Sequence, residues 1–337
     1  MLGVYPGKTL QLQVLNNCSD HLPFSDTVTA TISRTFSVTM STDSGHHVCA
    51  VLKLYDRRYG VDLRKLEPYA DEAGFRSLVR QGGGIDRVLR EMEEERKAAV
   101  IIRYPYDFYD DSPEGHARFE AAVWDECNKH FDCETKAYEP LGSLQGKAIP
   151  RMYAHVRLVP PGVIIPPDLL LRPELAPYFE VKGVLLELIS GYSLRDIGTS
   201  PLAPPDPADW SAVVQAAVDA AFEINKHGVT VGDCQPRNVV VDSSTQRPFI
   251  IDLARCGFRD EILESEEDEG EDTDPEVRFW EDAATVDNTG AIGKVMMARL
   301  QRTRGIELKL EFPRYSKVID DIKHSKVDSK LQSSTIA

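Results

Sequence analysis

Hydrophobic and polar positions divide the chain into a strand-rich first part and a more helical later part. The run at 27–40, rich in Thr, Val and Ile, is typical of a strand. The next run, 47–55, alternates so that its apolar residues share one face and Lys53 points to the opposite face. Further strands are predicted at 152–159, 181–189, 238–241 and 249–251.

Helical spacing of apolar residues predicts helices at 85–98, about 113–144 and 286–300. A strongly amphipathic helix begins near Trp210, after a Pro-rich connector, and ends at Gly228. A polar tail closes the chain.

Charge narrows the classes of function. The chain has 337 residues and a net charge of −15, which argues against a general nucleic-acid-binding surface or a surface for anionic membranes. A few local cations and a metal can still hold the phosphates of a nucleotide. The acidic stretch at 260–276 is typical of a solvated loop, and the alternative is a docking site for a basic protein partner.

The six cysteines form no CxxC pair and no Cys/His set with zinc spacing. Cys127, His130 and Cys133 come nearest, and we interpret them as structural residues of a helix. The first residues lack the pattern of a signal peptide, and no run approaches the ~20 apolar residues of a membrane span. We therefore expect an intracellular protein, in the cytoplasm or the nucleus, with free thiols.

The most informative stretch is HGVTVGDCQPRNVVVDSSTQRPFIID, residues 227–252. Asp233 follows a buried helix, Asn238 opens a short apolar strand, and Asp252 follows the next strand. Two antiparallel strands would bring these oxygen-bearing groups to one end of a hairpin. Phosphoryl transfer needs such groups, as oxygen ligands for Mg²⁺ and as a carboxylate that orients the acceptor hydroxyl. Each residue alone would fit an ordinary turn or strand end.

This stretch resembles the catalytic and metal-binding loops of the protein-kinase-like superfamily, in the style of divergent kinase-like proteins of filamentous fungi. The resemblance covers roughly residues 25–300. It implies an α+β fold of the two-lobed protein-kinase-like type, with a small β-rich N-lobe and a mainly helical C-lobe. It also implies that Asp233 is the catalytic aspartate and that Asn238 and Asp252 are ligands of Mg²⁺.

The implied N-lobe spans 1–186 and contains a helical insertion after the Lys53 strand. The implied C-lobe spans 187–320, and the polar tail spans 321–337. In this family Lys53 would contact the α- and β-phosphates of ATP.

Three further roles follow from the resemblance. Glu134 would be the glutamate that pairs with Lys53, and Glu139 is the alternative. Glu187 and Leu188 would present backbone groups to adenine from the hinge between the lobes. Asp287 would brace the catalytic loop from a later helix. Each has an ordinary interpretation as well. Glu134 could be a glutamate on a helix surface, the segment with Glu187 and Leu188 a buried strand before a turn, and Asp287 a carboxylate at the start of a helix.

The chain also departs from the family pattern. No G-x-G-x-x-G precedes Lys53, and Gly232 replaces the arginine that usually precedes the catalytic aspartate. Gln235 stands where Ser/Thr kinases have a lysine that contacts the γ-phosphate. Leu253 and Ala254 follow Asp252 in place of Phe-Gly, and no Ala-Pro-Glu occurs.

Three hypotheses follow. The first is an ATP-dependent phosphotransferase whose acceptor is a hydroxyl, on protein Ser/Thr by default or on a small molecule. The second is a pseudokinase that binds nucleotide or acts as a scaffold. The third is an unrelated α+β fold in which the kinase-like segment is coincidental.

Overall fold

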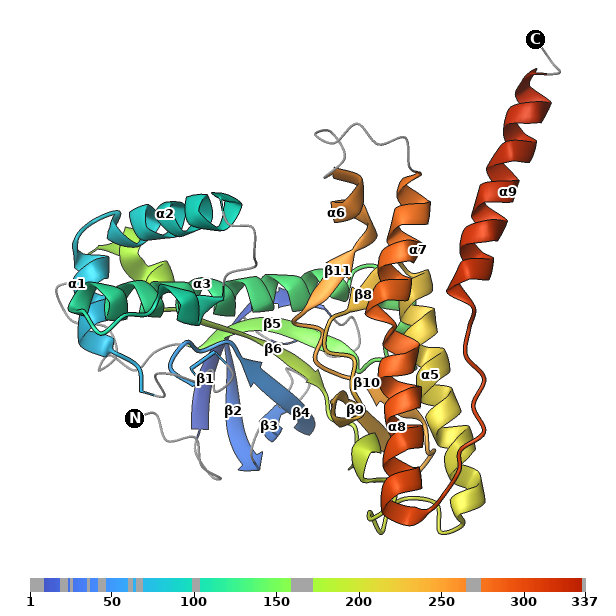
Figure 1. Cartoon of the computed structure of the whole chain (residues 1–337). Helices are drawn as coiled ribbons and strands as arrows, with labels where there is room; N and C mark the ends of the chain where they lie inside the picture. The colour runs from blue at the N-terminus through green and yellow to red at the C-terminus, as the bar shows by residue number, and fades with distance from the viewer. Residues whose placement is uncertain are drawn as a thin grey trace. The chain divides into compact units, whose positions relative to one another are not determined.

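The structure is a computed structural model that describes residues 9–18, 24, 27–34, 37–41, 47–59, 63–64, 69–98, 104–158, 172–264 and 274–334. Its fold class is α+β, with a curled β-sheet and a helical part, as the sequence predicted (Figure 1). The chain divides into two compact units. The first comprises Met1–Asp132 and Met152–Glu187, and the second comprises Cys133–Arg151 and Leu188–Ala337. The lobe boundaries suggested by the sequence stay predictions.

The first unit is built around a closed barrel of antiparallel strands in the order β1-β2-β3-β4-β6-β5. Alternate side chains point inward, and Leu12, Met40, Ala50 and Leu185 are among those buried in the core. Closure gives each strand two partners, which removes open sheet edges. The strands are β1 Thr9–Asn17, β2 Thr27–Arg34, β3 Ser37–Ser41, β4 His47–Leu54, β5 Met152–Leu158 and β6 Val181–Glu187.

The single strand predicted at 27–40 was wrong. The structure has two strands there, β2 and β3, which pair antiparallel with Thr31 opposite Thr39. Both halves carry the same alternation, and neither Gly nor Pro marks a reversal, so periodicity could not separate them. The strand predicted at 47–55 is confirmed as β4.

Helices α1 Glu72–Arg80, α2 Gly84–Ala98 and α3 Pro113–Ala137 share an apolar cluster that includes Phe75, Met92 and Ala121. Helix α2 matches the prediction. Helix α3 ends seven residues earlier than predicted, and a 3-10 turn follows it. Helix α1 was not predicted, because its nine residues are too few for a clear period.

A buried ion cluster ties the chain after β4 to helix α3. Glu120, 1% exposed, accepts hydrogen bonds from Arg64 at 2.6 and 2.9 Å and from Arg57 at 2.5 Å. Arg57 also donates to Glu72 at 2.6 Å, which adds a second carboxylate. Two guanidinium groups thus meet two carboxylates, which offsets the desolvation of the buried charges.

The second unit contains the helices α5 Trp210–Lys226, α6 Arg259–Glu264, α7 Pro275–Val286, α8 Asn288–Arg304 and α9 Tyr315–Ser334. Helix α5 packs against α8, and α7 packs against α9. The predicted apolar face of α5 is buried, for example at Val214, Ala217 and Val218. Helices α7 and α9 were not predicted. Helix α9 includes residues 321–334 of the segment that was expected to be a polar tail. Residues 265–273 of the acidic stretch lie outside the described part.

Two small antiparallel sheets accompany these helices, in the orders β10-β9-β7 and β11-β8. Gly228, at φ 80°, reverses the chain after α5 so that β8 can begin. The strands are β7 Gly191–Ser193, β8 Val229–Val231, β9 Val239–Asp242, β10 Pro248–Ile250 and β11 Cys256–Phe258. Short 3-10 helices occur at Pro105–Phe108, Gly142–Leu144, Pro173–Phe179, Leu194–Asp196, Pro207–Asp209 and Pro236–Asn238.

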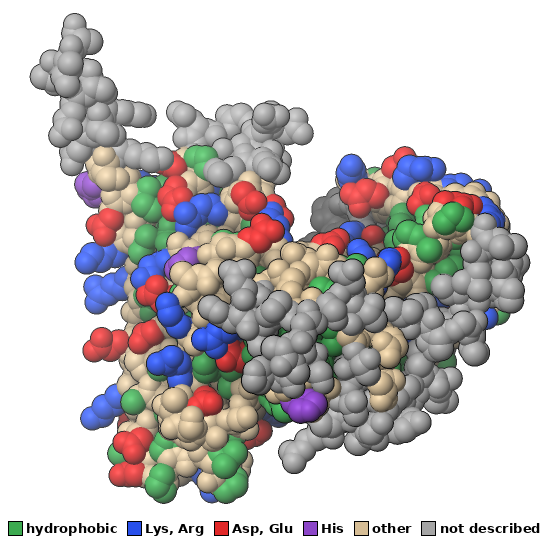
Figure 2. Space-filling view, turned by 180° about the vertical axis from the view of Figure 1, so that it is seen from behind, with side chains coloured by type: hydrophobic (Ala, Val, Ile, Leu, Met, Phe, Trp, Pro, Cys, Tyr) green, Lys and Arg blue, Asp and Glu red, His purple; other side chains and the backbone are tan. Residues whose placement is uncertain are grey.

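The visible surface of the helical unit carries charges of both signs. In Figure 2, Lys and Arg side chains are interspersed with Asp and Glu side chains over the helices at the left. Among the described helices, none combines the length and the apolar character needed to cross a membrane.

Candidate active site

The β9–β10 hairpin brings Asn238 and Asp252 to one end, as predicted. Asn238 directly precedes β9, and Asp252 comes two residues after β10. Val239 pairs with Ile250 across the hairpin, and the N–H of Ile251 donates to the carbonyl oxygen of Asn238 at 2.9 Å. The backbone therefore fixes the two residues as neighbours.

Asp233 is tied to the same end through Asn238. The Asn238 amide donates from Nδ2 to the Asp233 carbonyl oxygen at 3.0 Å and to Asp233 Oδ2 at 3.1 Å. With Nδ2 engaged in this way, Oδ1 is the atom of the amide that could ligate a cation. Asp233, Asn238 and Asp252 are thus brought together within the second unit.

Arg237 adds a positive charge that the sequence analysis missed. It donates to both carboxylate oxygens of Asp233, at 2.9 and 2.7 Å, and also to Gln235 Oε1. The signal in the sequence was its spacing, four residues after Asp233. A cation is therefore present near Asp233, although Gln235 replaces the expected lysine.

Asn288 braces the strand that leads to this loop. The side chain of Asn288, fully buried at the start of α8, accepts from the N–H of Val231 at 3.0 Å and donates to the carbonyl of Val231 at 2.6 Å. The prediction that Asp287 braces the loop was wrong. The amide of Asn288 can pair with both an N–H and a C=O, whereas the carboxylate of Asp287 has acceptors alone. Asp287 instead caps α8 through Gly290 N, at 3.0 Å, and binds Lys294.

A buried chain of hydrogen bonds extends this brace to the start of α9. Asn225 donates to Asn288 Oδ1 at 2.9 Å and to the Val229 carbonyl at 2.9 Å. The hydroxyl of Tyr315 donates to Asn225 Oδ1 at 3.0 Å. Side chains from α5, α8 and α9 therefore hold both ends of β8, two residues before Asp233.

Asp252 has a backbone conformation that is uncommon for a non-glycine residue, with φ of 66°. Such a conformation costs about 1–3 kcal/mol, less for Asp than for bulkier residues, and persists where packing enforces it. The next two residues, Leu253 and Ala254, are buried and supply that packing. Their burial explains why this position tolerates the strain.

The other predicted site residues lie in both units. In the first unit, Lys53 is half-buried on β4, with Nζ 5.4 Å from the ring centroid of Tyr55, and Glu187 ends β6 opposite Ala50. In the second unit, Glu134 is buried in α3 and Leu188 is exposed. Glu139, the alternative to Glu134, is exposed in the turn after α3.

The donor set at the hairpin end suits a hard cation. Among the described residues, no group of three or more His, Cys, Asp and Glu side chains forms a cluster that could hold a metal by itself. Mg²⁺ often takes one or two protein oxygens and completes its shell with phosphates and water. Asn238 and Asp252 could supply two such oxygens.

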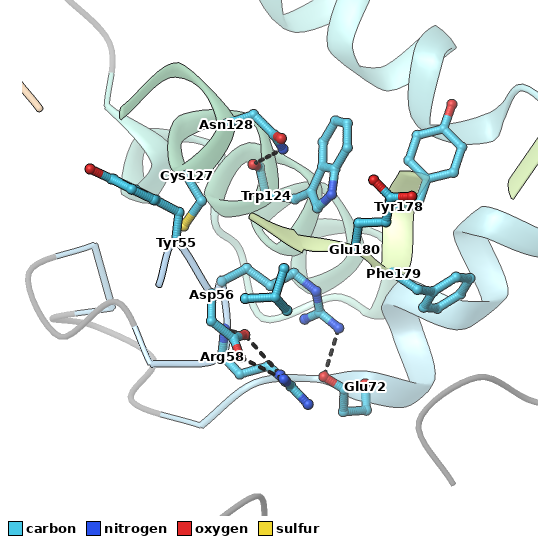
Figure 3. Close-up of a pocket in the computed structure, with 12 residues that line it drawn as sticks. Tyr55, Asp56, Arg58, Glu72, Trp124, Cys127, Asn128, Tyr178, Phe179 and Glu180 are labelled. Atoms are coloured by element: carbon cyan, nitrogen blue, oxygen red, sulfur yellow. Dashed lines mark hydrogen bonds and ion pairs between the residues drawn. The ribbon is translucent and has the colours of Figure 1, made fainter. Parts of the chain in front are cut away.

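A cavity in the first unit has a different character (Figure 3). It measures about 30 Å³, room for a water molecule but not for a nucleotide. Arg58, which lines it, donates to Asp56 at 2.5 and 2.8 Å, and Glu72 binds Arg57. These side chains satisfy one another, so we interpret the cavity as part of the ion-paired core.

Comparisons with known proteins found little. No family model matches the chain, and no curated protein matches it. Among solved structures, it is similar to WaaP, seen in a complex with acyl carrier protein, with 17% sequence identity and a TM-score of 0.26. The alignment covers 50% of this chain and 73% of the WaaP chain. This likeness is too distant to inform fold or function.

Proposed function

We propose that this chain is an ATP- and Mg²⁺-dependent phosphotransferase with a two-lobed protein-kinase-like fold. It would transfer the γ-phosphoryl group to a hydroxyl, by default that of a protein Ser or Thr. The observation that carries the proposal is the convergence of Asp233, Asn238 and Asp252 at one end of the β9–β10 hairpin. Their order and spacing match the catalytic and metal-binding loops of that superfamily.

In the proposed reaction, the acceptor hydroxyl attacks the γ-phosphorus of ATP. A bond forms from the acceptor oxygen to phosphorus, the bond from phosphorus to the β–γ bridging oxygen breaks, and ADP leaves. The Asp233 carboxylate orients the hydroxyl and accepts its proton. The bonds from Arg237 and Asn238 fix the direction of that carboxylate.

Charge on the phosphates is met by several groups. Mg²⁺, held by Asn238 and Asp252, would neutralise negative charge on the β- and γ-phosphates. Lys53 would contact the α- and β-phosphates, with Glu134 as its partner. The backbone of Glu187 and Leu188 would receive the adenine.

A second candidate is a pseudokinase that binds nucleotide without turnover. The observation that favours it is the ion pair of Arg237 with both oxygens of Asp233, which competes with an acceptor hydroxyl for that carboxylate. The absence of a glycine-rich segment before Lys53 in the sequence points the same way. A small-molecule acceptor is the third candidate, supported by Gly232, which small-molecule kinases of the superfamily often carry.

Thermal unfolding with ATP and Mg²⁺ is the first test. A ligand at 100 times its Kd stabilises the folded state by about 2.7 kcal/mol, so binding should raise Tm. Asp252→Ala should abolish the shift. Asp242→Asn is a matched control, because Asp242 lies at the opposite end of the same hairpin and bonds its own turn.

Phosphate release or transfer to a generic protein acceptor is the second test. Asp233→Asn should keep the thermal shift and lose turnover by at least about 100-fold. Turnover that survives in Asp233→Asn would contradict the assigned role. If the unchanged protein shows a thermal shift with ATP and Mg²⁺ but no turnover, the nucleotide-binding pseudokinase is favoured. If it shows no thermal shift, both the phosphotransferase and the nucleotide-binding pseudokinase are refuted.

A further inference from the structure

Two cysteines lie side by side in the segment that follows Asp252. Cys133 is in the last turns of α3, and Cys256 begins β11. The N–H of Cys256 donates to Cys133 Sγ at 3.0 Å. Cys256 Sγ lies 3.3 Å and Cys133 Sγ 3.6 Å from the carbonyl oxygen of Leu253. The two sulfur atoms therefore share one small site, although 122 residues separate them in the chain.

The surroundings give the two thiols different chemistry. A hydrogen bond from Cys256 is the main cause that lowers the pKa of Cys133, and the N–H of Cys256 adds to it. Burial and the charges of Glu261 and Glu134 act in the opposite direction. The same hydrogen bond, with burial, raises the pKa of Cys256 well above its usual value. Cys133 is thus the better nucleophile, and Cys256 the thiol that keeps its proton.

Exposure distinguishes this pair from the two buried cysteines, whereas Cys18 and Cys49 are more exposed than either member of the pair. Cys133 and Cys256 are partly exposed, whereas Cys127 and Cys234 are buried and burial raises the pKa of each to about 12. Cys18 is exposed, but burial of its thiol raises its pKa. A small oxidant should therefore react at Cys133 in preference to these three.

We propose that Cys133 and Cys256 form an oxidation site at which a hydroperoxide produces an intramolecular disulfide. The Cys133 thiolate attacks the peroxide oxygen, the O–O bond breaks, and Cys133 becomes a sulfenic acid while hydroxide or an alkoxide leaves. The Cys256 sulfur then attacks the Cys133 sulfur, and water leaves with the proton of Cys256. Two thiols are oxidised and one peroxide is reduced. The site does not depend on the proposed phosphotransfer.

Peptide mapping can test the site, because trypsin places these cysteines on separate peptides. Cleavage after Lys and Arg gives 130–136 for Cys133, 256–259 for Cys256, 119–129 for Cys127 and 227–237 for Cys234. After one equivalent of hydrogen peroxide, a digest without reductant should contain 130–136 joined to 256–259. Their joint mass should be lower by two hydrogen atoms, and dithiothreitol should separate them.

Variants separate the two roles. Cys256→Ser should leave a sulfenic acid on Cys133 that a 1,3-dione reagent labels, and Cys133→Ser should prevent the joined peptide. Cys127 lies on the same helix as Cys133, and the Cys127→Ser variant should still give the joined peptide. Oxidation confined to Cys18 or Cys49, or joined peptides that link two chains, would overturn the proposal. The proposal would also be overturned if, after peroxide treatment, both thiols still reacted with iodoacetamide at the rate measured for the untreated protein.

Discussion

Asn288 holds Val231 by both of its backbone polar groups, at 3.0 Å to the nitrogen and 2.6 Å to the oxygen. The contact connects the first turn of α8 with the strand two residues before Asp233. Because both partners are buried, each bond is protected from competition with water. The direction of the loop that carries Asp233 therefore depends on a residue far away in the sequence.

The first prediction concerns this brace. In Asn288→Asp, the carboxylate cannot donate to the Val231 carbonyl and carries a charge into a buried site. We expect a loss of about 3 kcal/mol or more in the free energy of unfolding, measured in urea. Asp287→Ala, which removes a helix cap, should cost about 1 kcal/mol. Equal losses in the two variants would contradict the assignment of the brace to Asn288.

The second prediction concerns pH and Tyr315. Burial is the main cause that raises the pKa of Tyr315, whose neutral hydroxyl donates to Asn225. Because its pKa is higher in the folded state, the contribution of Tyr315 to stability is complete at pH values below the unfolded-state pKa of about 10. This contribution is lost as the pH rises from that value through the folded-state pKa. Tyr315→Phe should cost about 1 kcal/mol at neutral pH and flatten the fall in stability above pH of about 10. An unchanged alkaline profile would show that other groups control it.

The third prediction concerns the ion cluster of the first unit. Glu120→Gln leaves Arg57 and Arg64 with one carboxylate, Glu72, between them. We expect a loss of about 3–5 kcal/mol in urea unfolding, because a buried positive charge is left uncompensated. Lys129→Ala removes a partly exposed pair with Asp125 on the same helix and should change stability by less than about 1 kcal/mol. Similar small losses in both variants would mean that the cluster contributes little.

The fourth prediction concerns Arg237 and rests on the proposed phosphotransfer. Its pair with Asp233 is partly exposed, so Arg237→Ala should cost less than about 1 kcal/mol in stability. Turnover should fall by about 10-fold or more, because the carboxylate loses two bonds that orient it. Arg237→Lys should restore part of the rate. A faster Arg237→Ala enzyme would show instead that the ion pair restrains Asp233.

Much of the local structure could be predicted from the sequence. Periodicity located β4, α2, α5 and the β9–β10 hairpin, because each buries one face and so carries a clear repeat. Asp233, Asn238 and Asp252 could be proposed together because their spacing along a hairpin determines that they meet. Short or weakly periodic elements, such as α1 and the β2–β3 reversal, gave no such signal.

Tertiary structure decided the contacts between distant segments. Asn288 rather than Asp287 braces β8, because the buried Val231 offers both an N–H and a C=O, which an amide can pair with and a carboxylate cannot. Likewise, Cys133 and Cys256 meet only after the last residues of α3 and strand β11 have packed within the second unit. Hydrophobic patterning determines which face of an element is buried. The identity of the partner across that face depends on packing, which no local repeat encodes.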